Sequence, residues 1–313
     1  MMAADRDFDV IVIGAGAAGL SAALFATREK LKTLLIERLT FGGQIANAET
    51  IENYPGLPTS IRGIDLAVNM LDQIKPYGLQ TAFTEVEALH VDRRPFIVAT
   101  GLGSYTGRVV ILACGSSLKR LDVPGESAFE GRGVSSCATC DGGMFHNQEV
   151  AVVGGGDSAM DEALYLAELA AKVTVVHRSD QLRATRVLQE RAVAHPKIAW
   201  RWHTVVAGIE GREHVERLRL TDVVTGETSS LPVAGVFIYV GLQPNTDFLK
   251  DVLPLDAGGH VPVNQRMETQ LPGLYAAGDL RQHSARQVVS SAGDGATAAC
   301  FAMQYLRSAG PMS

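Results

Sequence analysis

The chain has 313 residues, of which 46% are hydrophobic and 20% charged, and its net charge is −6. This length and apolar content predict a globular protein of about two domains. The negative charge argues against a general nucleic-acid or membrane-surface binder, since both need a basic face. Four cysteines are too few for a secreted disulfide scaffold. Together with the lack of a signal-peptide pattern, they indicate a cytoplasmic protein.

The chain begins with a predicted strand and a glycine-rich turn. Residues 8–13 are apolar and β-branched, which is typical of a buried parallel strand. The uncharged stretch 10–27 has nearly the length of a membrane span, but its glycines favour a strand, a tight turn and a helix to about Glu29. In such a turn the glycines allow a pyrophosphate to approach the backbone. The turn is Gly14-Ala15-Gly16-Ala17-Ala18-Gly19.

The next strand, predicted at residues 32–36, ends in Glu37. An acid at this distance from a glycine-rich turn suits the ribose hydroxyls of an adenine dinucleotide. Residues 94–98 and 107–112, separated by a glycine-containing turn, then form a predicted β-excursion. The N-terminal part of the chain is therefore expected to bind a dinucleotide.

A Cys-x-x-Cys motif follows, Cys137 and Cys140, with Asp141 directly after it. Such pairs form disulfides that open and close easily, because their thiol pKa values are drawn toward neutrality. Asp141 is placed to pass a proton to the departing sulfur. A single Cys-x-x-Cys could also be half of a zinc site, but Cys114 and Cys300 lie far away without a matching histidine pattern. We expect no metal.

The strand, turn and helix pattern then recurs. Residues 149–153 form a predicted strand, a second glycine-rich turn opens a helix that continues through Ala171, and residues 173–176 form the next strand. After that strand the chain has His177 and Arg178, with Arg183 nearby. A site that binds the ribose 2′-hydroxyl of NADH would have an acidic residue at this position. Positive charge there suits a 2′-phosphate, so this site is expected to prefer NADPH. The second turn is Gly154-Gly155-Gly156-Asp157-Ser158-Ala159.

Two dinucleotide sites with a thiol pair between them predict an electron relay, for which a flavin is the usual carrier. Residues 273–279 read as a further buried strand that ends in an acid. The simplest arrangement is an α/β protein of two Rossmann-like, three-layer ββα domains, one inserted in the other. An FAD-binding domain of residues 1–116 and 247–313 would enclose an NADPH-binding domain of residues 117–246 that carries the Cys-x-x-Cys motif. The two linkers, near 116–119 and 243–247, would form a hinge.

With these motifs, the chain resembles the bacterial low-molecular-weight thioredoxin reductases over essentially its whole length. Further matches are at residues 42–44, 52–56, 278–279, 286–287 and 291–293. The resemblance implies an FAD and NADPH flavoprotein, a homodimer, and thioredoxin or a related small dithiol protein as partner. It also implies an order of reaction steps. NADPH reduces FAD, the flavin reduces the Cys137–Cys140 disulfide, and the inserted domain then rotates to expose the dithiol.

The same resemblance implies a set of site residues. The catalytic set is Cys137, Cys140 and Asp141. The FAD-binding set comprises Gly14, Ala15, Gly16, Ala17, Ala18, Gly19, Glu37, Arg38, Gly42, Gly43, Gln44, Asn53, Val86, Ala113, Gly115, Asp279, Arg286, Gln287 and Val288. The NADPH-binding set comprises Gly154, Gly156, Asp157, Ser158, His177, Arg178 and Arg183.

The chain departs from the family pattern at two sites that bear on specificity. Ser179 replaces the second of two adjacent arginines, which predicts a relaxed but not reversed preference for NADPH. Gly143 and Met144 replace a pair of aromatic residues that help to grip thioredoxin. Other acceptors therefore stay open: a glutaredoxin-like protein, ferric iron, a quinone, oxygen or a small-molecule disulfide. A redox-sensing flavoprotein is the alternative outside enzymes.

Overall fold

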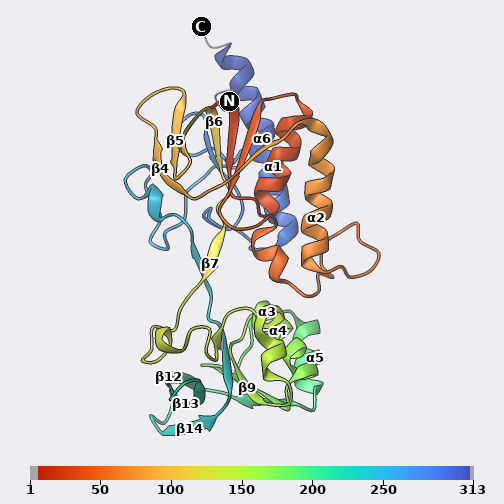
Figure 1. Cartoon of the computed structure of the whole chain (residues 1–313), viewed down its shortest axis with the longest axis vertical. Helices are drawn as coiled ribbons and strands as arrows, with labels where there is room; N and C mark the ends of the chain where they lie inside the picture. The colour runs from red at the N-terminus through yellow and green to blue at the C-terminus, as the bar shows by residue number, and fades with distance from the viewer. Residues whose placement is uncertain (1–5, 311–313) are drawn as a thin grey trace. The chain divides into compact units, whose positions relative to one another are not determined.

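The computed structural model describes residues 6–310 and divides into two compact units (Figure 1). The outer unit is formed by the chain up to Ser117 together with the part from Gln243 onward, and the inserted unit is Leu118–Leu242. The sequence analysis ended the inserted domain at residue 246, four residues after the boundary at Leu242. Each unit has its own sheet and its own hydrophobic cores.

The outer unit is built on a sheet with the strand order β3-β2-β1-β6-β5-β4, with β17 also paired to β6. The strands β1, β2, β3, β6 and β17 pair in parallel, whereas β5 pairs antiparallel with both β4 and β6. Because β6 is long, its first half belongs to the antiparallel excursion and its second half to the parallel sheet. The strands are β1 (Asp7–Ile13), β2 (Thr33–Glu37), β3 (Gln80–Phe83), β4 (Val86–His90), β5 (Phe96–Thr100), β6 (Gly103–Leu112) and β17 (Leu274–Ala276).

Three helices lie together beside this sheet (Figure 1): α1 (Ala17–Arg28), α2 (Gly63–Ile74) and α6 (Val288–Ala309). The helices α1 and α6 come from opposite ends of the described chain and pack closely. A side chain at Gly295 would lie 1.9 Å from the Ala18 carbonyl oxygen, so only glycine permits this approach. The core they share includes Leu20, Tyr275 and Leu306.

The inserted unit has a parallel sheet with the order β11-β10-β9-β15-β8. The helices α4 and α5 pack on one side, where Val152 and Val175 point, and an antiparallel sheet, β12-β13-β14, packs on the other, where Val153 and Val176 point. The inserted unit therefore has the three layers of a ββα fold, as expected, and the outer unit is an α/β unit with a mostly parallel sheet. The elements are β8 (Val134–Ser135), α3 (Ala138–Asp141), β9 (Glu149–Gly154), α4 (Asp157–Leu169), β10 (Lys172–Val176), α5 (Arg186–Ala194), β11 (Ile198–Arg201), β12 (Thr204–Gly211), β13 (Val215–Asp222), β14 (Thr228–Pro232) and β15 (Gly235–Tyr239).

The two linkers form a small sheet of their own, β7 (Ser116–Leu118) with β16 (Leu242–Pro244). Asn245 donates its side-chain N–H to the Cys114 carbonyl oxygen at 2.8 Å and accepts from the Ser117 hydroxyl at 2.7 Å. The two linker segments between the units are thus joined to each other by hydrogen bonds. Short 3₁₀ helices complete the fold: η1 (Gly43–Asn47), η2 (Lys75–Tyr77), η3 (Ser127–Phe129), η4 (Gly142–Phe145) and η5 (Asp247–Leu249).

Candidate active site

The sulfurs of Cys137 and Cys140 are joined in a disulfide, which confirms the pairing predicted from their spacing. Cys137 caps the four-residue helix α3, and its sulfur accepts the backbone N–H of Cys140 at 3.2 Å. Cys140 is exposed and Cys137 half-buried. The pair is therefore mounted on a single helical turn, with at least one residue open to an incoming reactant.

Asp141 ends this turn, and a serine holds its carboxylate in place. The Ser135 hydroxyl donates to Asp141 Oδ2 at 2.6 Å and accepts the Cys137 N–H at 3.1 Å. One hydroxyl thus links the carboxylate to the backbone of the first cysteine. The sequence analysis missed Ser135, although a serine two residues before a helix N-cap is a common backbone-binding pattern.

The outer glycine-rich turn leaves its backbone open toward space in front of α1. The N-cap Gly16 forms no side-chain cap, and a side chain placed there would meet only Gly42 O, at 3.9 Å. Gly14 has φ +100° and faces the Ala113 backbone, while a Cβ at Gly19 would strike Gly14 O at 1.8 Å. The three glycines make the turn, the open face and the tight packing that a pyrophosphate at a helix N-terminus requires.

Glu37 is fixed beside this turn by both of its oxygens. The Ala15 N–H donates to Oε2 and the Leu39 N–H donates to Oε1, each at 2.8 Å. Each carboxylate oxygen accepts more than one hydrogen bond, so the remaining lone pairs suit a pair of ribose hydroxyls. The geometry fits the adenosine end of FAD.

Gly42 and Gly43 bring a second stretch of backbone to the same place. Gly42 has φ +100°, and its N–H donates to the Ala15 carbonyl oxygen at 2.8 Å. A side chain on Gly43 would approach Gly16 Cα to 3.4 Å. Gln44, next in the chain, donates its side-chain N–H to the Ser116 carbonyl oxygen at 3.2 Å. Residues 42–44 therefore line the open face of the turn.

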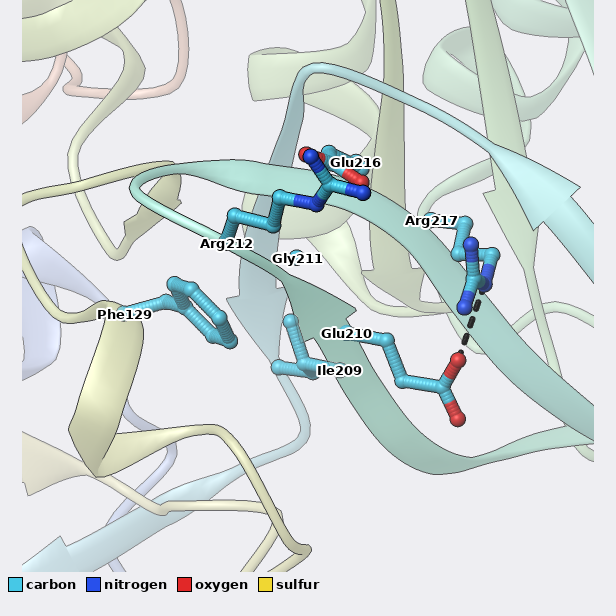
Figure 2. Close-up of a pocket in the computed structure, with 7 residues that line it drawn as sticks. All are labelled: Phe129, Ile209, Glu210, Gly211, Arg212, Glu216 and Arg217. Atoms are coloured by element: carbon cyan, nitrogen blue, oxygen red, sulfur yellow. Dashed lines mark hydrogen bonds and ion pairs between the residues drawn. The ribbon is translucent and has the colours of Figure 1, made fainter.

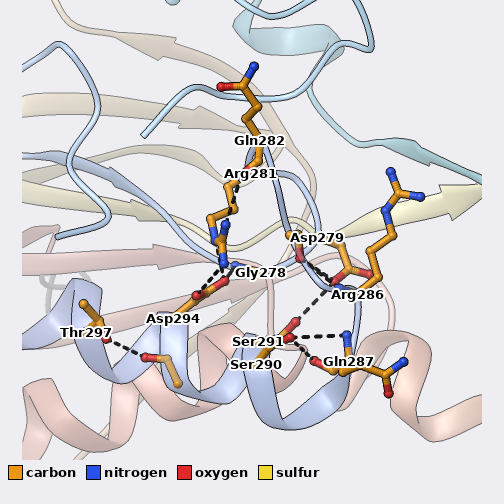
Figure 3. A network of polar contacts seen from close by, with 12 residues as sticks. Gly278, Asp279, Arg281, Gln282, Arg286, Gln287, Ser290, Ser291, Asp294 and Thr297 are labelled. Carbon is orange, nitrogen blue, oxygen red and sulfur yellow. Dashed lines mark hydrogen bonds and ion pairs between the residues drawn. The ribbon is translucent and has the colours of Figure 1, made fainter. Parts of the chain in front are cut away.

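The C-terminal residues of the predicted flavin site gather at the start of α6 (Figure 3). Asp279 accepts hydrogen bonds from the hydroxyls of Ser291 at 3.2 Å and Ser116 at 3.4 Å. Gln287 is the N-cap of α6 and accepts the Asn53 side-chain N–H at 3.1 Å. The structure thus brings together predicted site residues from opposite ends of the sequence. Arg286 and Gln287 are exposed, and Val288 is half-buried.

The other predicted FAD residues lie on or beside the strands of the outer sheet. Arg38 forms an exposed ion pair with Glu85 at 3.2 Å, and Val86 begins β4. Ala113 and Gly115 follow β6 on either side of Cys114, whose thiol is directed to the Ile13 carbonyl oxygen at 3.5 Å. Burial raises the pKa of the Cys114 thiol to about 12, so this cysteine stays protonated and acts as a small apolar residue.

The inserted glycine-rich turn has the same open face. Gly156 caps α4 without a side-chain cap, and a side chain there would meet nothing within 4 Å. Gly154 packs against the Tyr239 carbonyl oxygen, 2.4 Å from where its Cβ would stand. Asp157 accepts the Thr185 N–H at 2.6 Å and so holds the segment that contains Arg183, whereas Ser158 is exposed. The uncapped helix N-terminus suits the pyrophosphate of NADPH.

His177 lies inside the fold, where the sequence analysis had counted on its positive charge. Only 6% of its surface is exposed, and its ring packs beneath Gly155 and is hydrogen-bonded to the Ser179 hydroxyl and the Gln181 carbonyl oxygen. Burial, with a smaller effect from nearby arginines, lowers the pKa of this histidine. His177 is therefore neutral near pH 7 and supports the loop from below.

The positive charge at this corner comes from Arg178 and Arg183, which are both exposed. The N–H groups of Arg183 and Ala184 donate to the Gly155 carbonyl oxygen at 2.7 and 3.1 Å, so Arg183 is tied to the glycine-rich turn. The Ser179 hydroxyl is directed inward, toward His177 and Gln181. Ser179 therefore supports the loop and adds no charge to it.

A surface cavity of about 490 Å³ lies elsewhere, between η3 and the hairpin of β12 and β13 (Figure 2). Four of the side chains around it are charged, and Glu210 forms an ion pair with Arg217 at 2.8 Å. None of its residues belongs to the predicted site. The lining residues are Phe129, Ile209, Glu210, Gly211, Arg212, Glu216 and Arg217. Within residues 6–310, no helix is long and apolar enough to cross a membrane.

Comparisons with known proteins agree with this geometry. Residues 8–295 match the model of the family described as pyridine nucleotide-disulphide oxidoreductase. A thioredoxin reductase of Treponema pallidum is 45% identical over 96% of this chain and 98% of that protein, and one of Bacillus subtilis is 43% identical over 97% and 96%.

Solved structures give the same result. The thioredoxin reductase of Lactococcus lactis, in a structure described as the FR conformation, superposes with a TM-score of 0.93 at 39% identity, covering 95% of this chain and 98% of that one. The thioredoxin reductase of T. acidophilum superposes with a TM-score of 0.92 at 35% identity, covering 98% and 100%. The chain therefore belongs to the pyridine nucleotide-disulphide oxidoreductase family, and within it to the thioredoxin reductases.

Proposed function

We propose that the protein is an NADPH-dependent thioredoxin-disulfide reductase that carries FAD. The observation that supports this most directly is the Cys137–Cys140 disulfide, with a serine-held carboxylate at Asp141, in a unit that has its own open nucleotide turn. When bound, FAD supplies the carrier between a hydride donor and a disulfide. The outer turn with Glu37 and residues 42–44 would hold it, and the inserted turn with Arg178 and Arg183 would hold NADPH.

The chemistry of the thiol pair needs two electrons and two protons. The sulfur–sulfur bond breaks, and each sulfur becomes a thiol or thiolate. Asp141 directly follows Cys140 and would pass a proton to the departing sulfur, and the Ser135 hydroxyl holds its carboxylate in one orientation. The dithiol then attacks a disulfide of the partner and returns to the oxidised form.

Thioredoxin or a related small dithiol protein is the proposed partner. Met144, which follows the Cys-Asp-Gly motif, is 61% exposed and offers a soft apolar contact in place of an aromatic pair. We further propose that the enzyme is a cytoplasmic homodimer, as the resemblance implies. The paired linkers β7 and β16 would serve as the hinge on which the inserted unit rotates.

The test is steady-state reduction of the host's own thioredoxins by the purified yellow protein, with NADPH and with NADH. The variants Cys137→Ser and Cys140→Ser should lose thioredoxin reduction by at least a thousandfold while keeping electron transfer from NADPH to ferricyanide. If the thiol variants still reduce thioredoxin, or if the chain cannot be loaded with FAD, the proposal is wrong. A protein that reduces only iron, quinone or oxygen is instead one of the alternative flavoenzymes.

A further inference from the structure

The side chain of Arg286, directly before the N-cap of α6, contacts a histidine from another loop of the outer unit. Arg286 Nη2 lies 3.4 Å from Nε2 of the half-buried His260, which is 26 positions away in the sequence. A guanidinium only donates hydrogen bonds, so Nε2 is the acceptor and the ring of His260 carries its proton on Nδ1. The sequence analysis did not include His260 in the site.

Asp256 holds the ring of His260 in the orientation that this contact requires. Its Oδ1 lies 3.2 Å from His260 Nδ1, and the same oxygen accepts the backbone N–H groups of Gly258 and His260, each at 2.8 Å. The backbone N–H of His260 is the main cause that lowers the pKa of this carboxyl. A side chain on Gly258 would come within 2.8 Å of the His260 ring, which therefore packs against the turn. Nδ1–H thus faces the carboxylate, and Nε2 faces Arg286.

The loop that carries His260 is joined by backbone hydrogen bonds to the loop that leads into α6. The Val261 N–H donates to the Leu280 carbonyl oxygen at 3.0 Å, and the Gln282 N–H donates to the Val261 carbonyl oxygen at 2.9 Å. Val261 directly follows His260. The imidazole is therefore placed beside residues 280–286 by the pairing of the two backbones, and its contact with the guanidinium adds to that pairing.

The backbone of Arg286 has a conformation that is uncommon for a residue with a side chain. Its φ is +55°, in the left-handed region, which is unfavourable for residues other than glycine. The Ser284 hydroxyl accepts the Arg286 N–H at 3.2 Å and donates to Asp279 Oδ1 at 3.5 Å. The side chain itself is exposed and extends away from α6 (Figure 3). A long exposed side chain loses conformational entropy when it is ordered, and the contact with His260 favours one orientation.

We propose that His260 is a positioning residue of the flavin site. By accepting a hydrogen bond from the Arg286 guanidinium, it orders residues 286–288 in the conformation that receives FAD, before the cofactor arrives. A segment that is ordered in advance loses less conformational entropy on binding, so the affinity for the cofactor is higher. The inference rests on the proposed function in taking residues 286–288 as contacts of FAD.

The test measures the dissociation constant of FAD. Each protein, as the FAD-loaded full chain at pH 8, is diluted in steps, and the released FAD is measured by its fluorescence. His260→Asn keeps an N–H for Asp256 but is too short to reach Arg286, and it should raise the dissociation constant about fivefold, equal to about 1 kcal/mol. His260→Gln places an oxygen near the position of Nε2 and should stay within about twofold of the wild type. His90→Asn, at an exposed histidine of the same unit, is the matched control and should change nothing.

A double-mutant cycle separates positioning from a general loss of structure. If His260 acts through Arg286, then His260→Asn should change the dissociation constant by less than about twofold in a protein that already carries Arg286→Met. A full effect of His260→Asn in that background overturns the proposal, as does an equal loss of affinity in His260→Asn and His260→Gln.

Arg286→Met alone, at an exposed position, should show the same loss of about fivefold. Unchanged FAD affinity in this variant overturns the proposal even where a His260 variant does not fold. All of these values are read without NADPH and without thioredoxin. A protein that shows the expected pattern but does not reduce thioredoxin overturns the proposed function alone.

Discussion

Arg281 and Asp294 form a two-point ion pair in the outer unit, with Nε 2.6 Å from Oδ2 and Nη2 2.9 Å from Oδ1 (Figure 3). Asp294, which is 7% exposed, also accepts the Gly278 N–H at 3.1 Å. Gly278 directly precedes Asp279. The ion pair therefore anchors to α6 the loop that carries a predicted FAD contact.

Asp294→Asn is expected to destabilise the protein strongly, since it leaves the Arg281 charge half-buried without its partner. Breaking such a pair costs about 3–5 kcal/mol, measured as the free energy of unfolding in urea. Glu210→Gln, which removes an exposed ion pair with Arg217 (Figure 2), is the control and should leave the urea midpoint nearly unchanged. A loss below about 1 kcal/mol in Asp294→Asn would contradict the anchoring role.

Ser135→Ala should slow reduction of the disulfide about tenfold, because Asp141 loses the donor that orients its carboxylate. A hydrogen bond to a charged group contributes about 1.5–3 kcal/mol, and 1.4 kcal/mol corresponds to roughly tenfold in rate. The measurement is the rate at which free thiols appear after anaerobic mixing of the holoenzyme with NADPH. Ser136→Ala, at the exposed neighbouring serine, should react at the wild-type rate. Equal rates in both variants would remove Ser135 from the mechanism.

Arg178→Ala and Arg183→Ala should each lower the preference for NADPH over NADH by about tenfold or more, because each would remove a charge-assisted contact that we propose to the 2′-phosphate. The measured quantity is the ratio of kcat/KM for the two nucleotides. Arg212→Ala, at an exposed arginine of the same unit, should leave the ratio unchanged. In the wild type we expect a moderate ratio, because Ser179 adds no charge. A ratio that neither arginine variant alters would place the 2′-phosphate elsewhere.

His177 should make the protein less stable as the pH falls below about 6.5, the ordinary pKa of histidine. Its pKa is lowered in the folded state, so the unfolded chain binds the proton first and is favoured in acid. Above about pH 6.5 the His177 imidazole is neutral in both the folded and the unfolded state, so it no longer lowers the free energy of unfolding. His177→Gln should therefore show a shallower fall in unfolding free energy between pH 7 and 5 than the wild type. His146→Gln, at an exposed histidine, should keep the wild-type slope; identical slopes in all three proteins would refute the effect.

The glycine-rich turns could be predicted from the sequence because their determinants are local. Gly14 and Gly19 meet within one turn, and the apolar residues before them define β1 directly. The Cys137–Cys140 disulfide is equally local, with a separation of three residues. Helix and strand ends were accurate to within a few residues, as for α4, which ends at Leu169 rather than Ala171.

The contacts that the sequence analysis missed join residues that are distant or ordinary. Arg281 and Asp294 belong to no motif, and their pairing depends on where α6 packs. Glu162 reaches Ala138 across 24 positions because α4 lies against α3. The charge expected of His177 was wrong for a similar reason, since burial under Gly155 depends on the surrounding fold and not on its neighbours in sequence.

The pairing of β17 with β6 and of α6 with α1 also fixes an order of events during synthesis. The outer sheet needs β17, and the outer helical layer needs α6, so neither is complete until these two elements have left the ribosome. The inserted unit emerges whole before either element exists, and its sheet takes all of its strands from that stretch. The inserted unit, which carries the disulfide, can therefore fold on the ribosome before the outer unit is complete.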